Sequence, residues 1–130
     1  MEDFRIIMDA NFLMIPESHG VNIFNELDRI VDRKYELFVP EVVIGELENL
    51  KENGTPFERK AAKVGVELAS KAKKIPSEKP ADEEILRLTE KGNCAVATSD
   101  SNLQKRLREE GIPVIYLRQR THLEIEGSIK

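Results

Sequence analysis

The sequence predicts an α/β protein, a three-layer α/β/α sandwich built on a central, mainly parallel sheet. Short apolar runs alternate with amphipathic segments of helical periodicity, which is the pattern of a parallel sheet covered by helices on both faces. Proline or glycine separates most of these segments. The length of 130 residues suits one ordinary domain with its own core. We therefore expect a single domain over residues 1–130, with a polar tail from about residue 118.

The first half of the chain predicts two strands and two helices. Phe4–Met8 is a short apolar run that suits a buried strand, and residues 21–31 repeat apolar side chains at helical intervals. Tyr35–Val39 predicts the second strand. Residues 40–51 predict a helix, because a proline opens the segment and Gly54 lies just beyond its end.

The second half predicts three more helices and two more strands. Residues 57–72 carry an apolar stripe at helical spacing beneath a face rich in lysine and glutamate. A polar loop bracketed by two prolines follows. The remaining expected elements are a helix over 82–91, a strand over 94–98, a helix over 103–110 and a strand over 113–117.

Composition narrows the classes of function. Charged residues make up 34% of the chain and aromatic residues 5%, so the core must be aliphatic. The net charge of −4 is not that of a typical nucleic-acid binder, which would here need a local basic patch. Cys94 is the only cysteine and lies in an apolar run, which predicts a buried, inert thiol and excludes a multi-cysteine zinc site. No apolar stretch approaches the roughly 20 residues that span a bilayer, so we expect a cytoplasmic protein.

Two expected strands lead directly into an aspartate, Asp9 and Asp100. The carboxyl ends of parallel strands meet at one edge of a sheet, where ligands bind in such folds. We therefore expect both carboxylates at that edge. The structural alternative for each is a helix N-cap, since Asp is a preferred cap residue and Asp100 directly precedes an expected helix.

A third acid, Glu46, falls on the same helical arc as Val43 and Leu47. We expect its carboxylate to point inward with them. An inward carboxylate is costly unless it binds a metal ion or a basic partner. The alternative is a boundary glutamate that reaches past its neighbours to water.

A fourth acid, Asp82, is expected on the same helix side as Ile85, whereas Glu83 and Glu84 are expected to point away. It could also be a first-turn acid that complements the helix dipole. Four such acids on separate segments form a more specific pattern than any one of them. Clustered carboxylates repel one another unless a divalent cation neutralises them, and hard oxygen ligands suit Mg²⁺ or Mn²⁺.

The segments that carry these acids resemble the motifs of one family, the PIN-domain nucleases. Residues 7–12 look like the family's strand followed by Asp-x-Asn, and residues 39–47 look like its helix with an inward glutamate. Ala81-Asp82 is similar to the third acidic motif, and residues 96–103 are similar to Thr-x-Asp-x-x-Leu. The four motifs occur in order at family-like spacing, and the resemblance covers nearly the whole chain.

Within the family, residues 8–12, 96–100 and 113–116 look closest to the Fcf1/Utp24 branch, nucleases of small-subunit ribosomal RNA processing. The tail over residues 120–126 also looks like the ending of that branch. One position departs from the pattern, because the branch usually carries an aspartate where this chain has Asn102. Asparagine can ligate through its carbonyl oxygen but brings no charge, which puts a tightly held second metal in doubt.

The resemblance implies a metal-dependent endoribonuclease. Asp9, Glu46, Asp82 and Asp100 would be both the catalytic residues and the ligands of one or two Mg²⁺ or Mn²⁺ ions, with Asn102 in a supporting position. The ions would activate a water for attack on the phosphodiester, leaving a 5′-phosphate and a 3′-hydroxyl. Asn11 and Thr98 would orient Asp9 and Asp100 or position the water. Ordinary turn and strand-end hydrogen bonding is the alternative role for both.

The resemblance also implies RNA as the partner, from ribosomal RNA or a pre-ribosome, and PIN domains often pair as homodimers. Because an acidic site repels RNA, peripheral cations are expected to help binding. The alternative is that these cations form a solvated face. The candidates lie near the last helix and in the tail: Lys105, Arg106, Arg108, Arg118, Arg120 and His122.

Other functions remain as alternatives. A toxin-type PIN ribonuclease would cut transfer or messenger RNA with the same chemistry, and a scaffold would bind RNA or a ribosome-assembly partner without cutting it. A haloacid-dehalogenase-like phosphatase would require a second aspartate where this chain has Asn11. A dinucleotide-binding fold is excluded because no glycine-rich loop follows the first strand.

Overall fold

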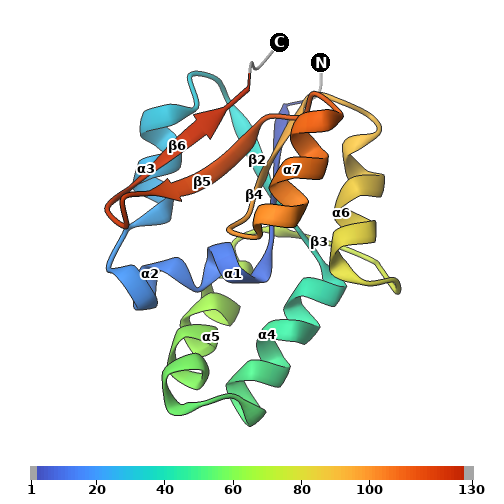
Figure 1. Ribbon diagram of the computed structural model, residues 1–130. Coiled ribbons are helices and arrows are strands. Elements are labelled where there is room, and N and C mark those ends of the chain that lie inside the picture. The colour runs from blue at the N-terminus through green and yellow to red at the C-terminus, as the bar shows by residue number, and fades with distance from the viewer. Residues whose placement is uncertain (1–2, 128–130) are drawn as a thin grey trace.

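A six-stranded sheet runs through the middle of the protein in a computed structural model that describes residues 3–127 (Figure 1). The strand order is β3-β2-β1-β4-β5-β6, and every neighbouring pair is parallel except β5 and β6. The strands are β1 (Phe4–Met8), β2 (Tyr35–Pro40), β3 (Lys73–Ile75), β4 (Cys94–Ala97), β5 (Val114–Arg118) and β6 (His122–Glu126).

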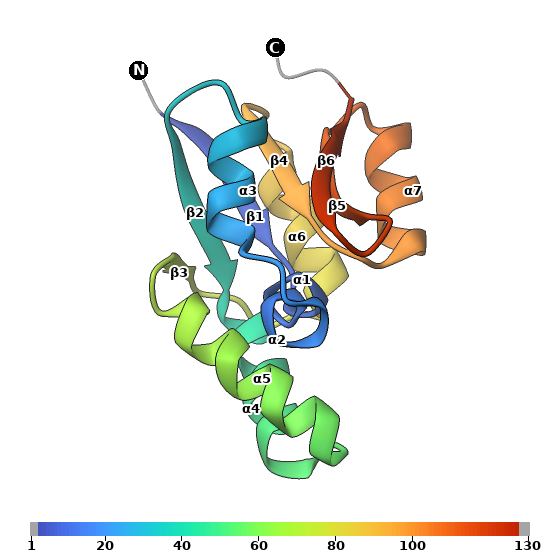
Figure 2. The same ribbon diagram turned by 90° about the vertical axis from the view of Figure 1, so that its left-hand side faces the viewer.

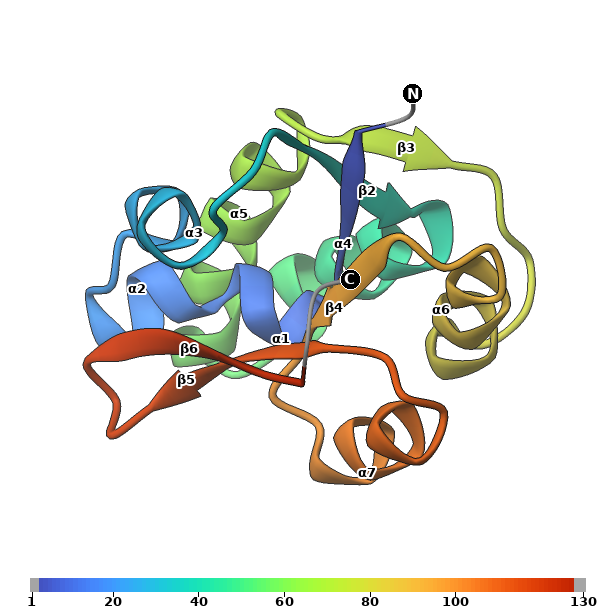
Figure 3. The same ribbon diagram turned by 90° about the horizontal axis from the view of Figure 1, so that it is seen from above.

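Helices cover both faces of this sheet, which confirms the expected three-layer arrangement (Figure 3). α6 and α7 pack on one face, and α1, α3, α4 and α5 contribute to the core on the other. The antiparallel pair α4 and α5 extends below the sheet (Figure 2). The helices are α1 (Ala10–Leu13), α2 (Ile15–His19), α3 (Ile23–Ile30), α4 (Glu41–Asn53), α5 (Pro56–Ala69), α6 (Ala81–Thr89) and α7 (Ser101–Glu109).

The alternation of side chains along β1 explains why both faces are covered. Ile6 and Met8 belong to the cluster beneath α3, α4 and α5, whereas Ile7 belongs to the cluster beneath α6 and α7. All three side chains are fully buried. Successive side chains of a strand point to opposite faces, and burying each of these large apolar groups contributes about 1.5–3 kcal/mol. A continuous apolar run therefore requires helices on both faces.

Several elements were not predicted from the sequence. The helices α1 and α2 are only 4 and 5 residues long, too short to show helical periodicity. β3 has 3 residues, and its two lysines are exposed. It pairs in parallel with β2 at the edge of the sheet, with Lys73 opposite Phe38 and Lys74 opposite Val39. Elements this short depend on tertiary pairing and not on their own sequence pattern.

The segment that the sequence describes only as a polar tail contains β6. Leu123 is buried, and its backbone is held by α3: its N–H donates to Glu26 at 3.0 Å and its carbonyl accepts from Arg29 at 2.8 Å. Glu26 and Arg29 also pair with each other at 2.9 Å. The strand thus pairs with β5 and is also held by α3, a helix far away in the sequence.

Cys94 and Phe57 differ in how deeply they are buried. Cys94 is buried, as expected, and burial raises the pKa of its thiol. Phe57 was expected in the apolar stripe of α5 but is 63% exposed, because it lies in the first turn of that helix beyond the reach of the core. Among residues 3–127, no helix is both long and apolar enough to cross a membrane.

Candidate acidic site at the carboxyl edge of the sheet

The four acids singled out in the sequence line one cavity of about 340 Å³. It opens where β1 and β4 end and where α1, α4, α6 and α7 approach one another (Figure 1). The backbones of the two strand ends are joined there, since the N–H of Asp9 donates to the carbonyl of Ala97 at 3.0 Å. The cavity is lined by Asp9, Ala10, Asn11, Met14, Glu46, Leu50, Pro80, Ala81, Asp82 and Asp100.

Asp9 is the buried member of the group, with 7% of its surface exposed. One carboxylate oxygen accepts from the N–H of Ala10 at 2.8 Å and caps α1, so the expected alternative of capping is also realised. The other oxygen accepts from the hydroxyl of Thr98 at 2.9 Å. Burial raises the pKa of Asp9, these two hydrogen bonds oppose the rise, and the negative charges of Asp100 and Asp82 add to it.

Glu46 does not point into the core, which corrects the expectation from helical periodicity. Val43 and Leu47 are fully buried, but the Glu46 side chain is exposed and lies at the wall of the cavity. Partial burial raises its pKa, and so do the negative charges of Asp9 and Asp82. At the position of Glu46, the inward side of α4 faces the open edge of the sheet and not the core. The carboxylate therefore reaches the acidic site without entering apolar surroundings.

On α6 the sequence assigned the inward and outward acids wrongly. The side chain of Asp82 is 51% exposed, whereas Glu84, expected to point away, is buried. Glu84 accepts from the backbone N–H of Glu78 at 2.9 Å and of Lys79 at 3.4 Å, and it pairs with Arg87 at 2.8 Å. These bonds lower the pKa of Glu84, the Arg87 contact most of all. The periodicity of α6 gave no sign that a loop would fold back onto this glutamate.

The loop between β3 and α6 helps to position two of the acids. Ser77 accepts from the N–H of Val42 at 2.9 Å and so caps α4, whose own preceding residue, Pro40, has no capping side chain. The same loop is tied to α6 through Glu84. The helix that carries Glu46 and the helix that carries Asp82 are therefore joined to one short polar segment.

Asp100 is both a helix N-cap and a residue at the carboxyl edge of the sheet, the two positions that the sequence left open for it. Its carboxylate accepts from the N–H of Asn102 at 2.9 Å and of Leu103 at 3.2 Å, which makes it the N-cap of α7. It also lines the acidic cavity. Asn102 contributes this backbone contact and is exposed, but its side chain is not among those that line the cavity.

Hydrogen bonds connect the ends of β1 and β4 through Asn11 and Thr98. Asn11 accepts from the N–H of Ser99 at 2.9 Å and lies 3.4 Å from the hydroxyl of Thr98. Thr98 is fully buried, donates to Asp9 and accepts from the N–H of Asp100 at 3.1 Å. The sequence did not indicate Gln104, whose side-chain amide donates to the carbonyl of Thr98 at 2.7 Å.

Replacing Thr98 with valine should therefore damage both the fold and the site. The change leaves the N–H of Asp100 without its acceptor, which we expect to cost about 1–3 kcal/mol in the free energy of unfolding. It also frees the Asp9 carboxylate to rotate, for which we expect about a 10–100-fold loss of any metal-dependent activity. Thermal melting and a cleavage assay measure the two effects.

Thr89→Val is the matched control for this change. Thr89 is also buried, but its hydroxyl donates only to the carbonyl of Leu86 within α6. We expect this variant to retain activity. Equal losses of activity in the two variants would show that Thr98 has no special part in the site.

The six cations considered for RNA contact do not form one patch. Arg106 on α7 lies beside the acidic site, with its guanidinium nitrogen 3.6 Å from Asp82. Lys105 and Arg108 are exposed on the same helix, and Arg108 pairs with Glu126 at 3.7 Å. The other three lie at or beside the turn between β5 and β6, on the opposite side of the molecule from α6 (Figures 1 and 3): Arg118, Arg120 and His122.

The turn between β5 and β6 constrains these three cations. Arg118 pairs with Glu124 at 3.0 Å, and the imidazole of His122 lies 4.0 Å from the same carboxylate. Arg120 is exposed and has a positive φ of 62°, a conformation that the tight turn imposes. Only Arg106 of the proposed cations therefore stands next to the acids.

The acids suit a hydrated hard cation better than a closely chelated one. Between residues 3 and 127, no three acidic, histidine or cysteine side chains are close enough together to hold a metal ion by themselves. The charged side chains that line the cavity are all carboxylates, whose oxygens are ligands for Mg²⁺ and Mn²⁺, and Mg²⁺ retains several waters when it binds proteins. Burial raises the pKa of Asp9 and of Glu46 most, and the repulsion from neighbouring carboxylates that adds to this rise is the kind that a divalent ion relieves.

Comparisons with known proteins are consistent with this geometry. The sequence profile of the family described as "PIN like domain" matches residues 6–120. Ribonuclease VapC4 of Methanocaldococcus jannaschii is 32% identical over 97% of this chain and 99% of its own length. Ribonuclease VapC9 of Archaeoglobus fulgidus is 24% identical over 92% of this chain and 87% of its own length.

Solved structures share the fold. The PIN domain endonuclease Utp24 superposes with a TM-score of 0.76 at 23% identity, covering 97% of this chain and 93% of that structure. A domain of a functionally unknown protein from Methanocaldococcus jannaschii superposes with a TM-score of 0.62 at 18% identity, covering 97% of this chain and 96% of that domain.

Proposed function

This chain belongs to the PIN-like domain family, and we propose that it is a divalent-metal-dependent endoribonuclease that uses Mg²⁺ or Mn²⁺. The observation that carries the proposal is the convergence of Asp9, Glu46, Asp82 and Asp100, from four separate segments, on one cavity at the carboxyl edge of the sheet. Supporting it, relatives that align along almost the whole chain are named ribonucleases.

In this proposal the four carboxylates would hold a hydrated metal ion between them, with Asp9 as the most rigidly placed of the four. A bound divalent ion lowers the pKa of a water molecule and stabilises charge on the scissile phosphate. Thr98 orients the Asp9 carboxylate through its hydroxyl, and Asn11 ties the end of β1 to the loop before α7. Met14 and Leu50 form an apolar part of the wall.

Ribosomal RNA processing is the setting that we propose first, because the sequence motifs are closest to the Fcf1/Utp24 branch. A toxin-type ribonuclease acting on transfer or messenger RNA would use the same chemistry. That second setting is supported by the higher identity to VapC4, 32%, than to Utp24, 23%. A non-cleaving scaffold is disfavoured by the presence of all four acids.

The test is incubation of purified protein with ribosomal RNA, with transfer RNA and with a short single-stranded RNA, in Mg²⁺, in Mn²⁺ and after chelation. We expect cleavage only with a divalent ion, giving 5′-phosphate and 3′-hydroxyl ends. Products that carry 2′,3′-cyclic phosphates would contradict the proposal, since they arise from attack by the ribose hydroxyl. Cleavage that persists in an Asp9→Asn protein would come from a contaminating nuclease.

The two settings differ in the RNA that is cut. Defined cuts in ribosomal RNA, with transfer RNA left intact, support the processing role. Preferential cutting of transfer or messenger RNA, together with arrested growth when the chain is expressed, supports the toxin-type role.

A further inference from the structure

One ion pair joins the acidic site to a cation. The guanidinium of Arg106 lies 3.6 Å from a carboxylate oxygen of Asp82, and the other oxygen of Asp82 accepts from the N–H of Glu83 at 2.9 Å. The contact is loose, because the two side chains are 54% and 51% exposed and the distance exceeds that of a hydrogen bond. Exposed pairs of this kind exchange partners at little cost.

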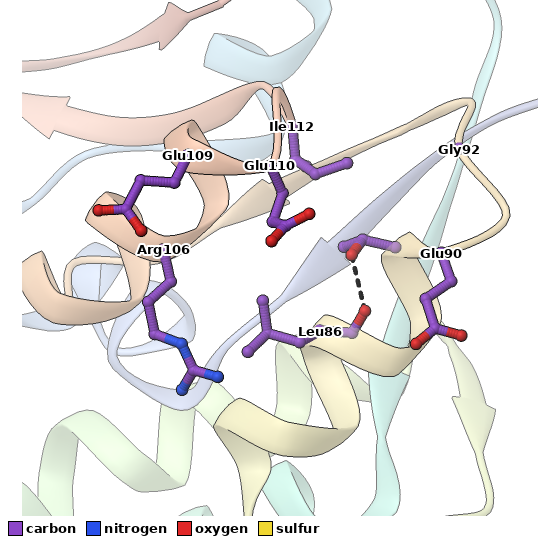
Figure 4. A pocket seen from close by; sticks show the side chains of 8 residues that line it. Leu86, Glu90, Gly92, Arg106, Glu109, Glu110 and Ile112 are labelled. Atoms are coloured by element: carbon purple, nitrogen blue, oxygen red, sulfur yellow. Dashed lines mark hydrogen bonds between the residues drawn. The ribbon is translucent and has the colours of Figure 1, made fainter.

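Arg106 reaches Asp82 from a second cavity. This cavity, of about 500 Å³, lies between α6 and α7 and has Leu86 and Ile112 in its wall, with Glu109 and Glu110 at the α7 side (Figure 4). Arg106 lines this second cavity, while Asp82 lines the acidic one. The guanidinium therefore has room to leave Asp82 while remaining at the edge of the site.

The charge of the acidic site gives this arginine a role. Four ionised carboxylates carry two more negative charges than a single divalent ion neutralises, and Asn102 adds none. A site left with that excess repels an RNA phosphate. Arg106 halves the excess, and it is the one of the six cations considered for RNA contact that pairs with an acid of the site.

We propose that Arg106 is an exchangeable counter-ion of the acidic site, an inference that rests on the proposed metal-dependent nuclease function. Arg106 pairs with Asp82 while no divalent ion is bound, and so competes with the ion for that carboxylate. Once Asp82 serves as a metal ligand, Arg106 turns to the RNA backbone and contacts a phosphate. The same positive charge thus weakens metal binding and strengthens RNA binding.

Opposite effects on the two ligands separate this role from a structural one. If Arg106 merely held Asp82 in position, its loss would weaken the binding of both metal and RNA. If it is an exchangeable counter-ion, its loss tightens metal binding and weakens RNA binding. The metal effect must also fade with salt, because interactions between exposed charges are screened as the Debye length falls to about 3 Å in 1 M salt.

The first measurement is the affinity for Mn²⁺ in the absence of RNA. Electron paramagnetic resonance detects the bound ion, and the titration is run once in low salt and once in high salt. We expect Arg106→Gln to bind Mn²⁺ about two- to five-fold more tightly than the unsubstituted protein at low salt, in line with the strength of exposed ion pairs. Arg106→Lys should keep most of the original affinity, because it retains the charge.

The second measurement is the binding of a fluorescent single-stranded RNA in Ca²⁺, checked on a gel to be uncut. We expect Arg106→Gln to weaken binding several-fold. The slope of the logarithm of affinity against the logarithm of salt concentration should fall by about 0.7, the value for one phosphate contact on a single strand.

Arg59→Gln is the matched control, since it removes the same charge from another exposed arginine of a helix, α5. Arg59 does not line the acidic cavity, and we expect neither measurement to change as it does for Arg106→Gln. Equal effects in the two variants would reduce the role of Arg106 to general charge and overturn the inference.

The outcomes distinguish the inference from the function beneath it. Unchanged or weaker Mn²⁺ binding by Arg106→Gln overturns the inference that Arg106 is an exchangeable counter-ion. The nuclease proposal still stands in that case, as long as the unsubstituted protein binds the ion. If the unsubstituted protein itself binds no Mn²⁺, the proposed function fails and the inference fails with it.

Discussion

Replacing Asp9 with asparagine is expected to abolish RNA cleavage and, at neutral pH without metal, to make the protein more stable. Asparagine keeps the shape of the side chain, and its carbonyl oxygen can still accept the N–H of Ala10. It removes a buried negative charge that lies near those of Asp100 and Asp82. Even partners that only orient a metal ligand cost about 10–100-fold when removed, so loss of the ligand itself should cost more than about a hundredfold.

The stability effect has a defined pH dependence. The pKa of Asp9 is raised in the folded protein above its ordinary value of 3.8, so the folded state binds the proton more tightly than the unfolded chain does. The stabilisation is complete below that ordinary value and is lost as pH rises through the folded pKa. The advantage of Asp9→Asn should therefore be largest at neutral pH and shrink as the pH falls toward 4.

Thermal melting across this pH range, in the presence of a chelator, measures the difference between the two proteins. Asp32→Asn is the control, because Asp32 is 86% exposed and lies outside the acidic cavity. We expect it to cleave RNA normally and to show no comparable gain in stability. An Asp9→Asn protein that is less stable than the original at neutral pH would contradict the expected cost of this buried charge and show that the charged carboxylate stabilises the fold.

Glu46→Gln is expected to remove activity with little effect on the fold. The side chain is exposed, and the buried residues of α4 that hold the helix in place, Val43 and Leu47, are untouched. The amide has one oxygen and no charge, so a metal ion loses an anionic ligand and binds more weakly. We expect a loss of cleavage of more than about a hundredfold, part of which excess Mn²⁺ restores, and a change in stability within about 0.5 kcal/mol.

Glu48→Gln makes the same chemical change two residues further along α4. Glu48 is exposed and forms an ion pair with Lys51 at 3.4 Å, away from the cavity. We expect it to retain activity. Parallel losses of stability and of activity in Glu46→Gln would assign that glutamate a structural role instead.

Much of the fold was predictable because the signals are local. The apolar runs of β1 and β4 and the periodicity of α3, α4, α5 and α7 each lie within one segment, and all of these elements are present. Asp9 and Asp100 could be placed at one edge for the same reason, since each directly follows a strand. Parallel pairing of β1 with β4 then brings their ends together.

Helical periodicity failed where contacts between distant segments decide which way a side chain faces. The loop before α6 donates two backbone hydrogen bonds to Glu84, which buries that residue and leaves Asp82 exposed. On α4 the same inward arc holds Leu47 in the core and Glu46 at the open edge of the sheet. Helical periodicity predicts the direction in which a side chain leaves the helix axis. It does not predict which other segment of the protein lies in that direction.

From the sequence alone came the fold class, the family resemblance and the four acids, because strand-end positions and segment patterns depend on residues next to one another in the chain. The tertiary structure decided that these acids share one cavity, that α3 holds the tail as β6, and that Arg106 alone of the proposed cations stands beside them. Each of these depends on side chains meeting across many residues of chain, where the cost of burying charge and the need to satisfy backbone hydrogen bonds select the partners.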